Sequence, residues 1–291
     1  MRLASLLAAL LTLAACKAEP PPEFSGPPSP ALFEITSPDG AVEGWMFGTI
    51  HSLPDGVEWK TEPLSQALAQ ADLLVVEVRD LGDAAAMRKA FAARAYTAGQ
   101  VPLTDKVPSE KRDALSAILT EHGLSPKTFA EMETWAAALT LAQYATTGDA
   151  ANGVDRALIG EMPRAEVIEL EGATRQLDTF DRLPENEQRD MLAAVVADTA
   201  GARANPYRHA VDWYRGRIDH LADPATSALL ADPELREALY TARNRDWSGR
   251  IAAILEGAPQ PMVAVGAAHL AGEDGLPALL IARGYAVRRI Q

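Results

Sequence analysis

WMFGTIH at residues 45–51 and VAVGAAH at residues 263–269 share one pattern, a short apolar run followed by Gly-x-x-His. Short apolar runs of this kind are typical of buried strands. In open α/β sheets, ligands bind beyond the carboxyl ends of the strands, and imidazole is a common metal ligand. The repeat therefore predicts a sheet that brings His51 and His269 to one pocket. The alternative is that each histidine only forms local hydrogen bonds at the end of its strand.

The segments around the two motifs follow the same order, which is strand, Gly-x-x-His, loop, helix and strand. The first unit ends in the apolar run at 72–78, and the second continues into a helix at 275–283 and a strand at 286–290. Units of this βαβ type join parallel strands. The sequence thus predicts an α/β fold with a mixed sheet built from two βαβ-like halves, each carrying one Gly-x-x-His motif. A hairpin, with strands at 32–35 and 42–47, precedes the first motif.

The centre of the chain, residues 82–232, is predicted to be a large helical insertion between the two halves. Apolar residues recur there at helical spacing, and one further strand is expected at 166–171. A long helix at 233–255 then leads to the second motif. The helices expected within the insertion cover residues 84–98, 109–122, 133–146 and 184–200.

The N-terminus resembles a bacterial lipoprotein signal, with a basic start, an apolar stretch at 3–13 and then Leu-Ala-Ala-Cys at 13–16. We expect a signal peptide at 1–15, a lipidated Cys16 with a proline-rich linker at 16–30, and a folded domain at 31–291. An ordinary secretory signal with a stray cysteine is the alternative. Because Lys17 rather than aspartate follows the cysteine, we expect a periplasm-facing lipoprotein of the outer membrane.

The chain has 291 residues and a formal net charge of −13, which makes nucleic acid a poor partner. Cys16 is the one cysteine, so no disulfide within the chain and no catalytic thiol is available. The motifs of elbow-type serine hydrolases, P-loop NTPases and His-Glu-x-x-His zincins are absent from the sequence. The sequence therefore does not support membership of these three enzyme classes.

Glu77 ends the buried run at 73–76 and should lie at the same sheet edge as His51. A buried carboxylate is costly unless it is paired or binds a metal. Two histidines and one carboxylate would suit a catalytic divalent ion such as Zn²⁺, Mn²⁺ or Co²⁺. The alternative is that Glu77 reaches solvent or pairs with a base such as Arg79. Gly48 and Gly266, which open the two motifs, would let backbone approach a ligand closely.

Glu171 also follows an apolar run and is a candidate general base, an orienting group for a ligand, or the N-cap of the next helix. Arg243 follows Leu235 and Leu239 at fourfold spacing, which predicts a partly buried guanidinium. Such a group needs an anionic partner, which could be a site carboxylate, a substrate oxygen that develops charge, or a structural ion pair.

Taken as a set, these motifs resemble the TraB/GumN family over residues 32–290, so that 31–291 is expected to be a TraB/GumN-like α/β domain. The family includes the Tiki metal-dependent proteases and is related to ChaN-like haem-binding lipoproteins and to erythromycin-esterase-like enzymes. One departure is Gly172, where members usually carry threonine after the glutamate. The resemblance is carried by 45–51, 71–77, Gly153-Val154-Asp155, Leu170-Glu171, Gln176-Leu177, Arg243-Asn244, 263–270, Gly272, Gly275-Leu276 and Gly284-Tyr285.

The resemblance implies a metal site of His51, His269 and Glu77, with Arg243 or Asn244 beside it. We therefore expect a membrane-anchored metal-dependent hydrolase that cleaves a peptide or related acyl bond in a peptide or small-molecule substrate. In this hypothesis Glu171 moves the proton, and Arg243 or Asn244 stabilises the oxyanion. The alternatives are a non-catalytic lipoprotein that binds haem or iron at the same histidines, and an anchored interaction module without an ion.

Overall fold

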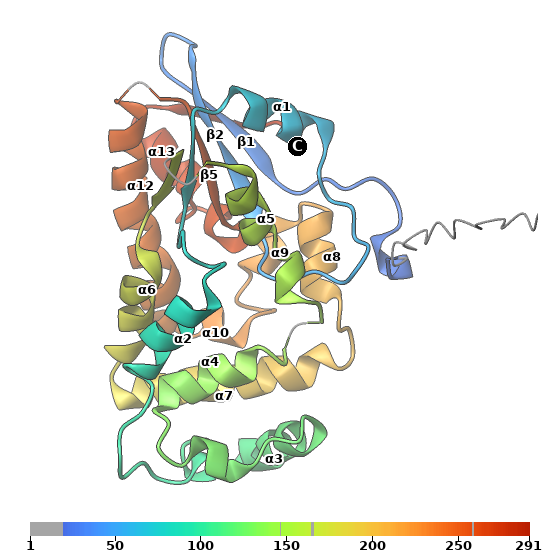
Figure 1. Cartoon of the computed structure of the whole chain (residues 1–291), viewed down its shortest axis with the longest axis vertical. Coiled ribbons are helices and arrows are strands. Elements are labelled where there is room, and N and C mark those ends of the chain that lie inside the picture. The colour runs from blue at the N-terminus through green and yellow to red at the C-terminus, as the bar shows by residue number, and fades with distance from the viewer. Residues whose placement is uncertain (1–19, 146, 164–165, 258) are drawn as a thin grey trace, which may run out of the picture.

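The computed structural model describes residues 20–145, 147–163, 166–257 and 259–291, and it shows a mixed α/β fold (Figure 1). Within this part of the chain, six strands form one mixed sheet in the order β4-β3-β5-β2-β1-β6. The strands are β1 (Leu32–Thr36), β2 (Val42–Thr49), β3 (Leu73–Val76), β4 (Val167–Glu169), β5 (Pro261–Gly266) and β6 (Ala286–Arg289).

β2, β3, β4 and β5 are parallel to one another, whereas β1 is antiparallel to both of its neighbours. Helix α1 (Glu62–Gln70) connects β2 to β3, and α13 (Leu276–Ala282) connects β5 to β6. These two crossovers run in opposite directions across the sheet, so right-handed connections place their helices on opposite faces. Adjacent strands whose connections diverge in this way form a topological switch point, where α/β sheets bind ligands.

Helices α3 (Arg112–Glu121), α4 (Thr134–Ala142) and α7 (Glu185–Ala202) of the central insertion lie below the sheet in Figure 1 and share a hydrophobic core of their own. Leu115 of α3, Trp135 of α4 and Leu192 of α7 are fully buried in this second core. Two other helices of the insertion, α5 (Val154–Glu161) and α8 (Arg208–Tyr214), pack against the core of the sheet instead. The remaining α-helices are α2 (Ala84–Ala92), α6 (Gly172–Asp181), α9 (Ile218–Leu221), α10 (Ala228–Ala231), α11 (Pro233–Arg236) and α12 (Ala242–Leu255).

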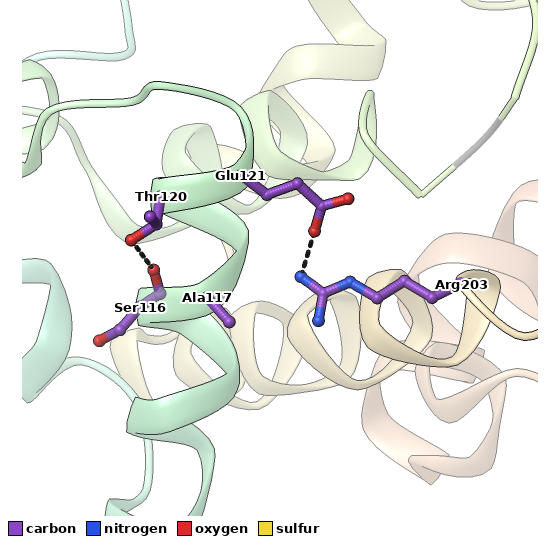
Figure 2. A pocket seen from close by; sticks show the side chains of 5 residues that line it. All are labelled: Ser116, Ala117, Thr120, Glu121 and Arg203. Atoms are coloured by element: carbon purple, nitrogen blue, oxygen red, sulfur yellow. Dashed lines mark hydrogen bonds and ion pairs between the residues drawn. The ribbon is translucent and has the colours of Figure 1, made fainter.

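An exposed ion pair joins the C-terminal ends of α7 and α3, where Arg203 donates to Glu121 at 2.5 Å (Figure 2). A broad hollow lies beside this pair, and all five residues that line it are exposed. Exposed ion pairs of this kind contribute little to stability. The hollow is therefore an open surface of the helical layer, and its lining includes none of the predicted site residues.

The predicted hairpin, the strand at 166–171 and the helical centre are confirmed, with β4 shorter than expected. Helix α2 ends at Ala92 rather than at residue 98, because the chain turns there and Tyr96 forms a β-bridge with Met132. The predicted helix at 233–255 contains a π-helical turn, η7 (Glu237–Thr241), between α11 and α12. The internal duplication of the two halves stays a prediction.

The proline-rich segment contacts the folded body well before residue 31. Phe24, in the short helix η1 (Pro22–Phe24), is buried and makes edge-to-face contacts with Tyr207 and Tyr214. Cys16 and the predicted signal peptide at 1–15 lie outside the described residues, so both stay predictions. Among the helices that are described, none combines the length and the apolar character needed to cross a membrane.

Candidate functional site

The ends of three adjacent parallel strands bring the predicted ligands to one edge of the sheet. Thr49 of β2 lies opposite Gly266 of β5, and His51 and His269 follow these two positions within three residues. Glu77 follows β3, the other neighbour of β5, and its Oε1 accepts a hydrogen bond from the backbone N–H of Gly266 at 2.8 Å. Residues 189 positions apart in the chain therefore meet at this edge.

Arg243 of α12 joins two buried carboxylates. Its Nη2 donates to Glu77 Oε2 at 2.9 Å and to Glu171 Oε1 at 2.5 Å, and its Nε donates to Glu171 Oε2 at 3.3 Å. Its guanidinium also lies over the Trp247 ring, with the carbon 4.4 Å from the ring centre. The predicted anionic partner of Arg243 is thus a pair of site carboxylates. Glu77 pairs with Arg243 and is 7% exposed, so it does not reach solvent.

Burial and charge act in opposite directions on the two glutamates. Burial by itself raises the pKa of Glu77, but nearby His269, Arg243 and His51 outweigh it and hold that pKa below its ordinary value. Burial raises the pKa of Glu171 despite its bonds to Arg243. Glu171 occupies the N-cap position of α6, yet its side chain makes no capping hydrogen bond. The N-cap alternative for its carboxylate is therefore wrong, because that carboxylate is turned toward Arg243.

His269 is buried and held by the neighbour of Arg243 in the chain. Its Nδ1 lies 2.6 Å from Asn244 Oδ1, while the Asn244 amide nitrogen donates to the carbonyls of Asp274 at 2.8 Å and His269 at 3.4 Å. Because this amide oxygen can only accept, Nδ1 carries the hydrogen. The lone pair of Nε2 faces Arg243, whose Nη1 donates to it at 3.4 Å. Burial lowers the pKa of His269 to about 4, so the ring is neutral at pH 7.

His51 is held by a residue of the insertion, Asp155 of α5. His51 Nδ1 lies 2.9 Å from Asp155 Oδ2, and Thr49 Oγ1 donates to Asp155 Oδ1 at 2.5 Å. The Asp155 carboxylate raises the pKa of His51 to about 9. Burial alone would raise the pKa of Asp155, but the charge of His51 lowers it. The His51 side chain is 70% exposed and that of Asp155 is 7% exposed. A buried carboxylate therefore holds an imidazole that faces solvent.

Replacing Asp155 by asparagine is expected to return the pKa of His51 from about 9 toward 6.5. In the parent chain the protonated pair stabilises the fold fully below pH 6.5, and this stabilisation is lost as the pH rises through about 9. An NMR titration of the His51 ring measures the shift. Glu161→Gln, an exposed change on the same helix, is the control and should leave that pKa unchanged. An equal His51 pKa in Asp155→Asn and the parent chain would contradict the assignment.

Gly48 and Gly266 allow close approach between parts of the protein. A Cβ at Gly48 would lie 2.9 Å from the Cβ of Ala267, the first residue of η8 (Ala267–Leu270), and one at Gly266 would lie 3.3 Å from Glu77 Oε1. The Gly48 carbonyl also accepts a hydrogen bond from Trp213 Nε1 at 2.8 Å. Gly48 therefore sets the packing of the two motifs against each other, and Gly266 admits the Glu77 carboxylate.

Gly48→Ala is expected to lower the free energy of unfolding by about 1–3 kcal/mol, because the added methyl overpacks the contact with Ala267. A denaturant titration measures the change. Gly82→Ala is the matched control, since a Cβ there meets nothing within 4 Å, and its effect should stay within about 0.5 kcal/mol. Equal stability of the two variants would show that the contact is not tight.

A cavity of about 180 Å³ lies beside these groups, and His51, Glu77, Asp155 and Gln176 are among the residues that line it. Gln176 Nε2 donates to Glu77 Oε2 at 3.3 Å. Of the predicted site residues, the edge thus brings together His51, Glu77, Glu171, Arg243, Asn244 and His269. Asp155 and Gln176 were not predicted as site residues, although both occur in the stretches that carry the family resemblance.

The donor atoms suit a divalent ion in type, but the three predicted ligands do not form a closed cluster. Among the described residues, one group of histidines or acids has ligand atoms within 4.8 Å of one another, namely Glu187, Asp232 and Glu234 at α7 and α11. His51, Glu77 and His269 are instead engaged with Asp155, Arg243 and Asn244. Each imidazole nevertheless has Nδ1 fixed by an oxygen, which is the usual arrangement behind a metal-binding Nε2.

The comparisons with known proteins give the same family as the motifs. The model of the family described as TraB/PrgY/gumN matches residues 31–289. Two proteins named "Uncharacterized protein YbaP", from Shigella flexneri and Escherichia coli (strain K12), are each 28% identical over 263 residues. These matches cover 86% of this chain and 92% of each relative. No solved structure matches the chain.

Proposed function

The chain belongs to the TraB/PrgY/gumN family, and from that premise we propose that it is a metal-dependent hydrolase acting on peptide bonds at the edge that carries His51, Glu77 and His269. The observation that carries the proposal is the shared support of the two imidazoles. Asp155 holds Nδ1 of His51, and Asn244 holds Nδ1 of His269. In both rings Nε2 is then the nitrogen that would bind an ion, and at His269 the ion would replace the 3.4 Å contact with Arg243 Nη1.

His51 and His269 would hold the ion through Nε2, with Glu77 as the third ligand. A divalent ion such as Mn²⁺, Co²⁺ or Zn²⁺ supplies a water of lowered pKa and polarises a substrate carbonyl. His269 is already neutral at pH 7, as a ligand must be. His51 carries a proton up to about pH 9 and has to release it, so metal binding should strengthen as the pH rises toward that value.

Arg243 is the residue that we assign to the oxyanion, through its charge, because its N–H groups already donate to Glu77, Glu171, the Leu239 carbonyl and His269. It is 13% exposed in its side chain, and a guanidinium in a sheltered site stabilises developing negative charge strongly. Glu171, whose pKa is raised by burial, is the acid-base group on the other side of Arg243. Asn244 is fully buried and both of its amide donors are used by carbonyls, so we assign it to positioning His269 rather than to the oxyanion.

We propose a peptide substrate at the cell envelope, with the chain anchored through a lipid on Cys16 and facing the periplasm, most simply from the outer membrane. The lipoprotein-like signal and the lysine after Cys16 support this placement. Both are features of sequence alone.

Mn²⁺-dependent or Co²⁺-dependent cleavage of a peptide library, read by mass spectrometry, tests the hydrolase. We expect cleavage by the full chain with metal and none after chelation by EDTA. Haem addition is the parallel assay, because the alternative function is haem or iron binding at the same histidines. The cavity of about 180 Å³ is smaller than the usual small-molecule pocket of about 300–1,000 Å³, so haem fits it poorly. The size of the cavity therefore favours the hydrolase over haem binding. A Soret band that disappears in His51→Ala, without any cleavage, would overturn our assignment.

A further inference from the structure

A second cavity, of about 320 Å³, lies against the same segment of chain as the candidate site. Ile50 and Ser52, the two neighbours of His51, line this cavity, whereas His51 itself lines the smaller one with Glu77. The two cavities therefore share segment 50–52 as a common wall. Among the described residues, the rest of the larger cavity comes from the second half of α7, from α8, from the loop between these two helices, and from two other loops that supply Ala145, Thr147, Ala225 and Thr226.

The wall of this cavity combines small apolar side chains with a few polar ones, Ser52, Thr147, Asn205 and Thr226, and with one acid and one base that are hydrogen-bonded to backbone groups. Asp198 accepts a hydrogen bond from the backbone N–H of Ala228 at 3.2 Å, and Arg208 donates to the carbonyl of Thr226 at 2.8 Å. His209 also lines the cavity, with its Nε2 2.9 Å from Arg208 Nη2, and burial lowers the pKa of its ring. Asp198 and Arg208 offset each other, so the cavity has no excess charge to attract an ionised group. Its apolar lining includes Ile50, Ala197, Ala202, Ala204, Pro206 and Ala210.

We propose that this cavity is a specificity subsite, which binds an uncharged apolar side chain of a peptide next to the bond that is cleaved at His51. The proposal rests on the proposed hydrolase function for its link to cleavage. The volume of the cavity lies at the lower end of the range for small-molecule pockets, which suits one side chain of leucine or phenylalanine size. The helical insertion thereby selects the substrate, while the sheet edge holds the reactive groups.

Gly201 offers a way to fill the cavity with little risk to folding. It lies in α7 and lines the cavity, and a Cβ built on it meets nothing within 4 Å. Replacing a helical glycine also favours the helix. Gly160 of α5 is the matched control, because it is likewise helical, exposed and open around its Cβ, and it lines neither cavity beside His51.

The first measurement is the cleavage profile of the full chain with Mn²⁺ on a peptide library. The parent chain and Gly160→Phe should both prefer leucine, methionine or phenylalanine at one position beside the cleaved bond. Gly201→Phe should lose that preference by about tenfold or more while still cleaving peptides with glycine or alanine there. An unchanged profile in Gly201→Phe, or a preference for charged residues, would overturn the subsite and leave the hydrolase standing.

The second measurement separates binding from catalysis. N-acetyl-leucinamide is titrated into the metal-free chain and followed by saturation-transfer NMR, with N-acetyl-aspartate amide as the charged probe. We expect binding of the leucine probe alone, and its loss in Gly201→Phe but not in Gly160→Phe. This result without any peptide cleavage would support the subsite and count against the hydrolase. No binding of the leucine probe, or equal binding by both variants, would overturn the subsite.

Discussion

His51→Ala and His269→Ala should each reduce metal-dependent peptide cleavage by more than about 100-fold. Loss of a group that merely supports a ligand costs about 10–100-fold in metal affinity or activity, and loss of the ligand itself exceeds this. The two variants should fail alike, although His51 is largely exposed and His269 is buried. Cleavage rates at saturating Mn²⁺ measure the effect.

The control for both variants is His122→Ala, which removes an exposed histidine at the C-terminal end of α3. Its cleavage rate should equal that of the parent chain. His269→Ala leaves the buried Asn244 oxygen without its partner, which destabilises the fold. The thermal stability of each variant should therefore be measured beside its cleavage rate. Cleavage within a few fold of the parent rate in either site variant, in a folded protein, would contradict the assignment of that histidine.

Arg243→Met is expected to lower the free energy of unfolding at pH 7 by about 3–5 kcal/mol. The change leaves Glu77 and Glu171 buried without their cation, and an unpaired buried charge is strongly destabilising. The loss should shrink as the pH falls, because Glu171 has a raised pKa and is neutralised first. Denaturant unfolding at several pH values measures both effects.

Two further variants make the test specific. Arg245→Met removes a cation two residues away whose side chain is 58% exposed, and it should change stability by no more than about 0.5 kcal/mol. Adding Glu171→Gln to Arg243→Met removes one of the two unpaired charges and should recover part of the lost stability. Equal stability of Arg243→Met and Arg245→Met would show that Arg243 is not the counter-ion of the two carboxylates.

Patterns confined to short stretches of sequence predict much of the edge that forms the site. The apolar runs before His51 and His269 become β2 and β5, and the run before Glu77 becomes β3. Adjacent parallel strands then place the three side chains together. The position of Arg243 on the inner side of its helix also follows from periodicity, although the π-helical turn before it does not.

The partners that hold these groups depend on tertiary packing and were not predictable in the same way. Asp155 reaches His51 from a helix 104 residues further along the chain, and the local pattern of α5 contains no sign of that contact. The buried aromatic side chain of Phe24 similarly makes a segment rich in proline contact the body. The bond between Asn244 and His269 likewise depends on tertiary packing, and it is the reason that we propose Asn244 as a positioning group rather than an oxyanion donor.

Metal content is the most direct test of the claim that His51 and His269 serve one ion. The full chain and its variants are dialysed against Mn²⁺, freed of unbound ion and analysed by inductively coupled plasma mass spectrometry. Glu187→Gln is included because the acidic group at α7 and α11 is the other place where ligand atoms gather. We predict a bound ion in the parent chain and in Glu187→Gln, and none in His51→Ala or His269→Ala. An ion retained in both histidine variants and lost in Glu187→Gln would contradict the account.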